Sequence, residues 1–318
     1  MEVRFWGTRG SLPASLTAAR VREKVREALE TAADKGLRAE DDVDAFMDDH
    51  LPFHSRATYG TNTSCVELRD GDRSLLCDAG SGLRDYGNHI MGLDERERPR
   101  DFHLLLSHLH WDHIQGFPFF VPALLPGYKI TLYGCHPDLE KAFALQQSAP
   151  FFPVDFHHLA SDVRFVRLPL DRETEIAGFQ VTPKEQNHPG KSFGYRLERN
   201  GTVVVYSTDA EHKNNHEEDM SPFTDFFQGA DLLIFDAQYT FADACTVKED
   251  WGHSNNLIGV EMAQKAGVRH LVLYHQDPNS TDRELERLLN DTRKLARLLQ
   301  KGSDFRVSIA WDGMVLEL

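Results

Sequence analysis

Four side chains of the kinds that bind divalent metals fall within six residues of the sequence SHLHWDHIQGF, at positions 107–117. They are His108, His110, Asp112 and His113. Imidazole nitrogens and carboxylate oxygens are the ligands that Zn²⁺, Mn²⁺ and Fe²⁺ accept in proteins. A cluster of uncompensated polar groups at the end of a buried strand would be costly. The segment therefore predicts a metal site rather than a polar turn.

The residues before this cluster predict how it is positioned. FHLLL, at 102–106, reads as a buried strand, so the cluster comes at its C-terminal end. Residues two apart on an extended chain point to the same side, so His108 and His110 can reach one metal. Asp112 and His113 follow where the chain turns toward IQGF, and they can face a second metal position.

Three more ligand-type residues stand next to predicted strands. His188 lies in the loop TPKEQNHPG, Asp209 follows TVVVYST, and His275 follows LVLY. Sites in α/β proteins collect where strands end, so we expect these side chains to join the first cluster. The set contains no cysteine, and its nitrogen and oxygen ligands suit Zn²⁺ first, with Mn²⁺ or Fe²⁺ as alternatives.

Short apolar runs rich in Val, Ile, Leu, Phe and Tyr recur along the chain and predict many strands. Helices are predicted from near Ser254 to Gly267 and over residues 280–302, where leucines recur at helical spacing. This mixture indicates two packed sheets with helices outside. Residues 16–56 read as two charged helices joined near Gly36, which form a solvated insertion in one domain spanning 1–318. A lid or a dimer contact is the alternative interpretation of this insertion.

The order of HxHxDH, a lone histidine, an aspartate and a final histidine resembles the metallo-β-lactamase superfamily. FWGTRGSLP near the N-terminus and LLCDAGSG extend the resemblance over nearly the whole chain. It implies an α/β fold, an αβ/βα sandwich of two mixed sheets with outer helices and two metal ions at one edge. The implied ligands of the first metal are His108, His110, His188 and Asp209. Those of the second metal are Asp112, His113, Asp209 and His275, with a hydroxide between the metals.

The resemblance also assigns roles outside the ligand set. Asp78, in CDAGSG, would orient a ligand histidine, and the alternative is a turn carboxylate that caps local N–H groups. WGHSNN resembles the motif in ribonuclease Z and its relatives whose histidine contacts the scissile phosphate, which is His253 here. Asp236, in FDAQYT, stands where those relatives carry the glutamate that orients this histidine. The alternative for His253 is a helix-capping neighbour of Ser254.

The implied chemistry is hydrolysis of a phosphodiester, because phosphodiesterases of the superfamily carry an aspartate at the bridging position, here Asp209. Two metals lower the pKa of water and neutralise phosphoryl oxygens. Asp112 and Asp209 would orient the hydroxide, and protonated His253 would donate to the leaving oxygen, so Asp112, His253 and Asp236 are the catalytic candidates.

Candidate substrate contacts are fewer. Lys191 and Ser254 are the best of them, and an ordinary surface lysine is the alternative for Lys191. Trp111 and the aromatic residues of GFPFF, at 116–120, can stack on a base, but core packing is the default expectation.

The net charge of −15 disfavours a partner held through a nucleic-acid backbone. Only 20 residues, 189–208, lie between His188 and Asp209, where ribonuclease Z inserts its tRNA-gripping arm. We therefore expect a small anionic substrate, a cyclic nucleotide or another cyclic phosphate diester, and not tRNA. Three alternatives stay open: ribonuclease Z-like RNA processing, a thioester or lactone hydrolase, and a non-catalytic nucleotide sensor.

The N-terminus MEVRFWGTRGS lacks the charged and apolar regions of a signal peptide, and no apolar run reaches membrane-spanning length. These features predict a soluble, cytoplasmic protein with no membrane partner. The sequence leaves a homodimer open.

Overall fold

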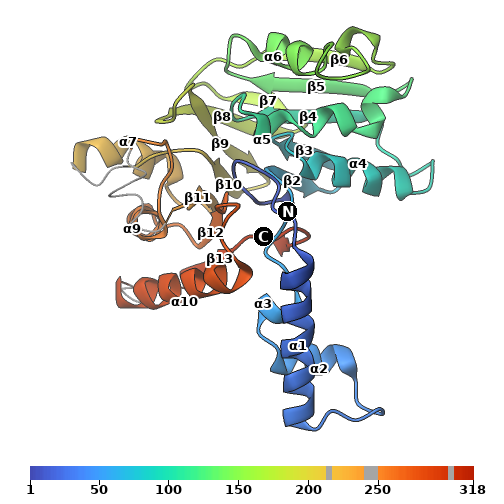
Figure 1. Ribbon diagram of the computed structural model, residues 1–318. Coiled ribbons are helices and arrows are strands. Elements are labelled where there is room, and N and C mark those ends of the chain that lie inside the picture. The colour runs from blue at the N-terminus through green and yellow to red at the C-terminus, as the bar shows by residue number, and fades with distance from the viewer. Residues whose placement is uncertain (213–216, 240–249, 300–303) are drawn as a thin grey trace.

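Two mixed β-sheets pack face to face, with helices on the outer side of each (Figure 1). The computed structural model describes residues 1–212, 217–239, 250–299 and 304–318. Within these ranges each sheet has seven strands. This arrangement confirms the predicted αβ/βα sandwich. That the whole chain is one domain remains a prediction.

The first sheet has the strand order β14-β1-β2-β3-β4-β5-β6. Its neighbouring strands are antiparallel from β14 to β3 and parallel from β3 to β6. Because parallel neighbours need crossover connections, helical segments separate β3, β4, β5 and β6 along the chain. The strands are β1 (Glu2–Gly7), β2 (Cys65–Asp70), β3 (Arg73–Cys77), β4 (Asp101–Leu106), β5 (Lys129–Gly134), β6 (Asp162–Arg167) and β14 (Val315–Glu317).

The second sheet has the order β13-β12-β11-β10-β9-β8-β7. Here the strands are antiparallel from β7 to β10 and parallel from β10 to β13. The strands are β7 (Thr174–Ile176), β8 (Phe179–Gln186), β9 (Ser192–Arg199), β10 (Thr202–Ser207), β11 (Leu232–Asp236), β12 (His270–Tyr274) and β13 (Arg306–Ile309). Each sheet thus brings the carboxyl ends of several parallel strands to one edge.

Apolar side chains from both sheets fill the space between them. Val3 and Leu75 of the first sheet share one buried cluster with Tyr195 and Val204 of the second. Strands β11 and β12 are buried at every residue, because helices cover the face that turns away from this core. Continuous apolar runs in the sequence therefore mark the centre of the second sheet.

Helices cover the outer faces. α9 and α10 pack on the second sheet, and α4 with η1 and η2 packs on the first. The predicted helix from near Ser254 is α9, which Asn255 caps, and the predicted helix over 280–302 is α10, with residues 300–302 outside the described ranges. These helices are α4 (Gly82–Gly92), α5 (Trp111–Ile114), η1 (Phe117–Phe119), η2 (Val121–Leu124), α6 (Leu139–Gln146), η3 (Phe156–His158), α7 (Glu217–Phe227), α9 (Asn256–Lys265) and α10 (Asp282–Leu299).

The segment 16–56 forms the predicted helical insertion and projects away from the two sheets (Figure 1). Its helices are α1 (Ala18–Lys35), α2 (Val43–His50) and α3 (Phe53–Arg56). α1 ends where Gly36 takes the left-handed conformation, with φ 70°, which glycine adopts without a Cβ penalty. The first predicted helix thus ends near this glycine, but the segment contains three helices where two were predicted, because the chain turns again at Leu51 and Pro52.

α1 contacts the body through polar side chains. Lys24 Nζ lies 2.6 Å from Asp282 Oδ2 on α10, and Arg283 pairs with Glu27. None of the residues of α1 is buried, and its apolar Val21, Val25 and Leu29 are exposed. The helix therefore contacts the body through charged residues and leaves these three apolar residues exposed to solvent.

No helix in the described ranges has both the length and the apolar character needed to cross a bilayer.

Candidate metal centre

The seven predicted ligands meet at the edge where strands of both sheets end. Five of them follow the strands β4, β8, β10 and β12, and the other two lie on the single turn of α5. In the order of the chain they are His108, His110, Asp112, His113, His188, Asp209 and His275. The structure thus places the seven side chains together at the ends of strands, and their role as metal ligands stays a prediction.

The first group of ligands contains His108, His110, His188 and Asp209, whose ligand atoms all lie within 4.8 Å of one another. His188 Nε2 lies 3.1 Å from His110 Nδ1 and 3.7 Å from Asp209 Oδ2. His108 Nε2 lies 3.6 Å from the same carboxylate oxygen. Three imidazoles and one carboxylate thus converge on one point.

The second group contains Asp112, His113 and His275. The Nε2 atoms of His113 and His275 lie 3.2 Å apart. They lie 3.3 Å and 3.2 Å, respectively, from Asp112 Oδ2. They also lie 3.2 Å and 3.3 Å from Asp209 Oδ1.

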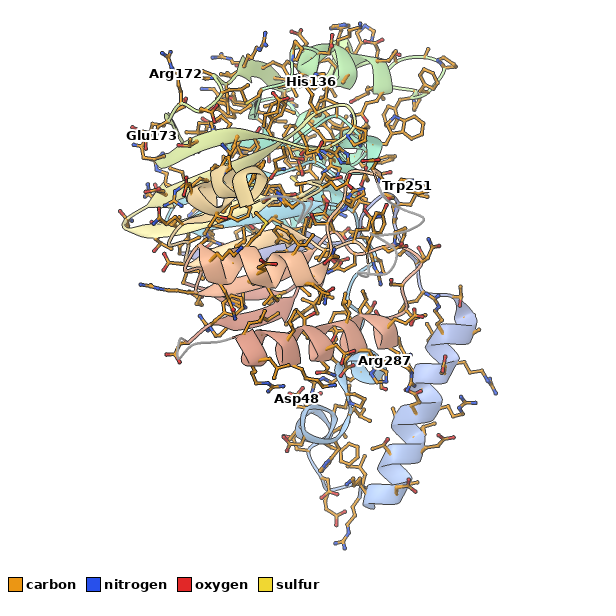
Figure 2. The ribbon with its side chains drawn as sticks, turned by 90° about the vertical axis from the view of Figure 1, so that its left-hand side faces the viewer. Asp48, His136, Arg172, Glu173, Trp251 and Arg287 are labelled. Atoms are coloured by element: carbon orange, nitrogen blue, oxygen red, sulfur yellow. The ribbon has the colours of Figure 1, made fainter. Side chains whose placement is uncertain are left out.

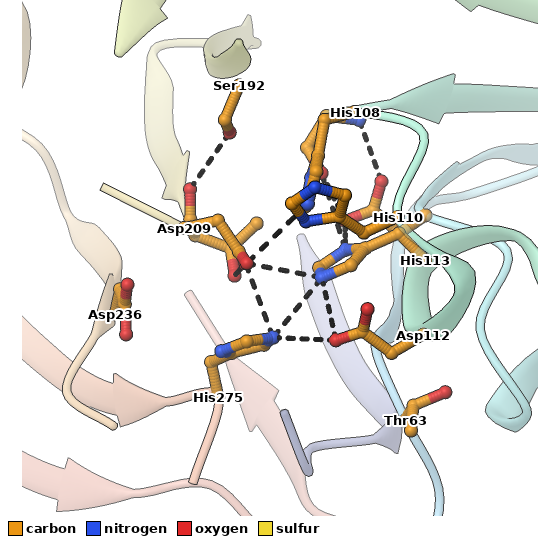
Figure 3. Close-up of polar contacts among 12 residues, drawn as sticks. Thr63, His108, His110, Asp112, His113, Ser192, Asp209, Asp236 and His275 are labelled. Carbon is orange, nitrogen blue, oxygen red and sulfur yellow. Dashed lines mark hydrogen bonds and ion pairs between the residues drawn. The ribbon is translucent and has the colours of Figure 1, made fainter. Parts of the chain in front are cut away.

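Asp209 joins the two groups. Its Oδ2 faces His108 and His188, and its Oδ1 faces His113 and His275. Figure 3 shows this carboxylate between His108 and His275. The arrangement is the one that a bridging carboxylate needs.

The residues present fit a pair of divalent metal ions. His108 Nε2 is buried and has no hydrogen-bond partner among the described residues, although it points toward the Asp209 carboxylate. A buried polar atom without a partner is costly unless an ion or water satisfies it. The donors are nitrogen and oxygen atoms, the set that Zn²⁺, Mn²⁺ and Fe²⁺ accept.

The charges of the cluster also favour a bound cation. Burial opposes protonation of His113, but Asp209, Asp112 and Asp78 outweigh it and raise the pKa of that imidazole well above its ordinary value. Burial opposes ionisation of Asp209, but His275 and the other neighbouring histidines hold its pKa well below the ordinary range. The centre therefore stabilises positive charge among buried carboxylates, which metal ions supply when bound.

Asp78 contacts the second group of ligands through His113. Its Oδ2 lies 2.7 Å from His113 Nδ1 and accepts a hydrogen bond from Tyr206 Oη at 2.7 Å. Its Oδ1 accepts a hydrogen bond from the Ser107 backbone N–H at 2.7 Å. These contacts are those of a carboxylate that orients a ligand histidine, which stays a prediction, and the N–H that Asp78 accepts comes from Ser107, 29 residues along the chain, rather than from its own turn.

Backbone groups orient other ligands. The Gly252 carbonyl oxygen lies 2.8 Å from His188 Nδ1, and the Ser11 backbone N–H donates to Asp112 Oδ2 at 2.7 Å. A Cβ at Gly252 would lie 2.4 Å from His188 Nδ1, and a Cβ at Gly10 would lie 2.5 Å from the His275 ring. These two glycines are required because the backbone passes so close to the ligand rings.

Three residues of the centre have left-handed backbone conformations. Asp78 has φ 63°, Asp209 has φ 50° and His275 has φ 60°. Such conformations are uncommon outside glycine, although Asp, Asn and His adopt them more often than other residues do. They cluster at functional sites, where the surrounding structure must hold them in place.

His253 and Asp236 form a pair beside the ligands. His253 Nδ1 lies 2.9 Å from Asp236 Oδ2, and Asp236 also accepts the Ala210 N–H at 3.1 Å. The His253 ring lies 5.1 Å from the His188 ring and 5.2 Å from the His275 ring. Burial opposes protonation of His253, but Asp236 outweighs it and raises the pKa to about 9. His253 is close enough to Asp209 and His275 to reach a metal, but Asp236 already engages its Nδ1.

The two predicted substrate contacts do not join the cluster. The Ser254 hydroxyl is buried, donates to Ala210 O at 2.5 Å and accepts the His212 N–H at 3.0 Å. It therefore holds two loop segments together. Lys191 pairs with Glu185 at 3.1 Å, and its side chain is 62% exposed, as expected of an ordinary surface lysine.

The default expectation of core packing for the aromatic segment is wrong in part. Trp111 is 75% exposed and Phe119 is 55% exposed, whereas Phe117 and Phe120 are buried. α5 is only one turn long, so its outward side carries Trp111 immediately beside the ligands of the second group. Stacking on a substrate ring thus remains open to Trp111.

Several residues of the centre were missed in the sequence. Tyr206, Ser11 and Gly252 support Asp78, Asp112 and His188, respectively. Each lies far along the chain from the group that it supports, so no local spacing relates them. One signal was available for Ser11 and Gly252, because they lie within FWGTRGS and WGHSNN, two stretches that already resembled family motifs.

The sequence comparisons agree with this geometry. A family model described as a beta-lactamase superfamily domain matches residues 73–276, which include all seven ligands. An uncharacterized protein of Mycobacterium leprae is 30% identical over 206 residues, covering 61% of this chain and 66% of that protein. The match therefore spans slightly less than two thirds of that relative. Ribonuclease BN of Proteus mirabilis is 22% identical, with 64% of this chain and 79% of the relative covered.

Solved structures share the fold over nearly the full chain. YhfI of Bacillus subtilis, a metallo-beta-lactamase fold protein, has a TM-score of 0.62 at 20% identity, covering 99% of this chain and 98% of that one. A diphosphatase from the PhnP family has a TM-score of 0.60 at 17% identity, covering 100% and 97%. At these identities the likeness establishes the fold alone.

Proposed function

Because this chain belongs to the metallo-β-lactamase superfamily, we propose that it is a metal-dependent hydrolase and that it hydrolyses a small anionic phosphodiester. A cyclic nucleotide or another cyclic phosphate diester is the proposed substrate class. Zn²⁺ is the proposed metal, with Mn²⁺ or Fe²⁺ as alternatives, since the ligands are imidazoles and carboxylates.

The observation that carries the proposal is the His253–Asp236 pair. Hydrolysis of an unactivated phosphodiester must protonate a poor leaving group, whereas the cations neutralise the phosphoryl oxygens. An imidazolium beside the metal ligands suits that task. Asp236, whose Oδ2 lies 2.9 Å from His253 Nδ1, fixes the ring and leaves Nε2 as the donor atom.

The ligands and their supports have separate parts in this reaction. Two divalent ions, held by the seven ligands, would lower the pKa of water and neutralise the phosphoryl oxygens. Asp209 offers one carboxylate oxygen to each ligand group, and the Ser11 N–H fixes the Asp112 carboxylate. Asp78 keeps His113 oriented through its Nδ1. His253 then supplies a proton to the leaving oxygen.

The short segment between His188 and Asp209 and the negative net charge of the protein favour a small substrate over tRNA. Residues 189–208, between His188 and Asp209, are largely occupied by the hairpin of β9 and β10, which leaves no room for a long arm. The net charge of −15 would repel a nucleic-acid backbone. The relative named ribonuclease BN supports phosphodiester chemistry without requiring the same substrate. A cytoplasmic location, the lack of a membrane partner and a homodimer remain predictions.

A substrate panel tests the proposal. Protein loaded separately with Zn²⁺ and Mn²⁺ should be assayed on bis(p-nitrophenyl) phosphate, 3′,5′- and 2′,3′-cyclic nucleotides, precursor tRNA, a thioester and a lactone. We expect turnover of at least one cyclic diester that exceeds turnover of the thioester, the lactone and the tRNA. Lys294→Ala is the matched control, because this exposed lysine of α10 pairs with Asp291 and should leave the rate unchanged. Preferred cleavage of the thioester or lactone, or tight nucleotide binding without turnover, would replace the proposal with the corresponding alternative.

A further inference from the structure

A second concave site lies away from the metal centre. A groove of about 700 Å³ runs between α10, β13 and α3. Figure 1 shows α10 beside both of these elements. His270, the first residue of β12, lines the groove, whereas His275 directly follows that strand at the metal centre. The two sites are therefore separated by the length of β12, roughly 17 Å.

The groove carries unpaired positive charge. Arg293 and Arg297 of α10 and Arg306 of β13 line it, and all three are exposed. None of them forms an ion pair with a carboxylate in the part of the chain that the structure describes. In a protein with a net charge of −15, three arginines facing one groove without carboxylate partners are unusual.

The single acidic side chain among the described lining residues does not neutralise these arginines. Glu286 Oε2 lies 2.5 Å from His54 Nδ1 and accepts the His54 backbone N–H at 2.9 Å. This carboxylate is therefore already engaged by the helical insertion. The guanidinium groups remain available to an anion from solution, and a planar guanidinium can bind carboxylate, sulfonate or phosphate oxygens through two parallel hydrogen bonds.

Other residues that line the groove are aromatic and apolar. The Phe53 ring lies 5.0 Å from the Trp311 ring and 4.6 Å from the Tyr59 ring. Phe305 and Leu289 extend this surface. Apolar walls with a few convergent polar groups, in a volume between about 300 and 1,000 Å³, are typical of small-molecule sites.

We propose that this groove binds a small anion that also carries an aromatic ring. The ring would lie against Phe53 and Trp311, and the anionic group would be bound by Arg297 and Arg306. Arg293 has a structural role as well, because its Nε donates to Val307 O at 2.9 Å. Arg293 therefore fixes the edge of β13 and contributes its remaining N–H donors to the anion.

Such a ligand would join parts of the chain that are distant in sequence. Phe53 and Tyr59 come from the end of the insertion and the loop after it, Leu289 from α10, and Trp311 from the C-terminal segment. Binding would therefore connect the insertion to the body at a place other than the Lys24–Asp282 contact. It would also stabilise the folded protein, because a ligand that binds only the native state shifts the unfolding equilibrium.

The aromatic sulfonate 8-anilinonaphthalene-1-sulfonate provides a direct test. It should be titrated into the folded, metal-loaded protein and followed by fluorescence and by isothermal calorimetry. We expect saturable binding at one site, weakened roughly tenfold or more in Arg297→Gln/Arg306→Gln, since charge-assisted hydrogen bonds are lost. Arg287→Gln is the matched control, because Arg287 is an exposed arginine of α10 that does not line the groove (Figure 2). The control should bind the probe as the unmodified protein does.

Two further variants separate the groove from other surfaces. Ser308→Trp, which fills the groove from β13, should abolish binding, and Asp209→Ala, at the metal centre, should leave it unchanged. Three results would each overturn the proposal: no saturable binding below about 1 mM, equal affinity in the double variant and the Arg287→Gln control, or loss of binding in Asp209→Ala. None of these results bears on the proposed phosphodiesterase activity, which has its own substrate panel.

Discussion

The metal centre and the helical insertion depart from ordinary burial in opposite directions. At the metal centre, His108 and Asp209 are each only 1% exposed, although they are polar or charged. On α1, Val25 and Leu29 are 52% and 66% exposed, although they are apolar. Buried charged groups need compensation, whereas exposed apolar side chains have no such requirement. The comparison teaches that burial of polar groups is the stronger indication of function in this chain.

The two regions also differ in how their contacts are made. In the metal centre, side chains from both sheets point at common positions, and a further layer of groups orients them. The insertion instead contacts the body partly through ion pairs with solvent access, such as Arg283–Glu27. Ion pairs with solvent access are worth little individually. Changes at the centre should therefore alter chemistry, whereas changes on the outer face of the insertion should alter very little.

The largest expected effect is at the bridging carboxylate. Asp209→Ala removes an oxygen from each ligand group, so bound metal should fall from up to two ions per chain to one or fewer, and hydrolysis should fall to background. Metal analysis of dialysed protein and a steady-state assay measure both quantities. Asp48→Ala, on α2 of the insertion, is the matched control and should retain metal and rate (Figure 2). Full metal content in Asp209→Ala would contradict the bridging assignment.

The next largest effect is at His253. His253→Ala should retain its metals but lose roughly 10²–10⁴-fold in rate on unactivated diesters, the usual contribution of a positioned acid. The loss should shrink on p-nitrophenyl esters, because a weakly basic leaving group needs little protonation. His50→Ala on α2 is a control histidine of the insertion. Equal losses on both ester types would remove the general-acid role, and a fall in metal content would make His253 a ligand.

A smaller effect on metal affinity is expected at Asp78. Asp78→Asn keeps the size of the side chain but weakens its contact with His113 Nδ1, now 2.7 Å from Oδ2. We expect the affinity for the second metal to fall about 10- to 100-fold, as is usual for groups that orient a ligand. Competition with a chelator of known affinity measures the change. Unchanged affinity would mean that Asp78 does not tune the second metal through His113.

His270 provides a test of stability against pH outside the metal centre. This buried histidine has its pKa lowered to about 4, first by burial and then by Arg306 and Arg293. His270 is therefore protonated near pH 6.5 in the unfolded chain but only near pH 4 in the folded chain. Its contribution to stability is complete above pH 6.5 and is lost as the pH falls from 6.5 toward 4, by up to about 3 kcal/mol.

Chemical unfolding at several pH values measures how the free energy of unfolding depends on pH. His270→Gln, which can still hydrogen-bond to Ser308, should lose less stability over the same interval than the unmodified protein. Identical pH dependence in the two proteins would show that His270 does not carry the effect.

The smallest effect is expected on the outer face of α1. Leu29→Ala should change the free energy of unfolding by no more than about 0.5 kcal/mol, because the side chain is already exposed. Its matched partner is Leu271→Ala in β12, which is fully buried and should lose about 2–5 kcal/mol. Urea denaturation of the two variants compares them directly. A large loss at Leu29 would mean that this face is covered in solution.

Most of the fold and the ligand set could be predicted because their signals are local. The central strands are continuous apolar runs, and His108, His110, Asp112 and His113 lie within six residues. Strands β7 and β14, of three residues each, were not predicted. Such short segments carry no readable period-2 alternation, and they are strands because β8 and β1 pair with them.

The contacts that could not be predicted join distant segments. Ser254 was expected to contact substrate, but its hydroxyl reaches Ala210, and Asn255 is the residue that caps α9. The arginines of the groove could not be predicted as a cluster for the same reason. Helical spacing places Arg293 and Arg297 on one face of α10, but only the folded chain brings Arg306 of β13 beside them.

The left-handed backbone at Asp78, Asp209 and His275 has a consequence for how this centre tolerates substitution. Asn and Gly enter such conformations at little cost, whereas Val, Ile and Thr do not. At Asp78 and Asp209, selection for folded protein alone would therefore admit asparagine and glycine, and selection for metal binding would then remove them. The acceptable amino acids are set twice at the same positions, once by main-chain geometry and once by ligand chemistry. Few single-step replacements satisfy both, so the centre has little freedom to drift toward a new ligand set one residue at a time.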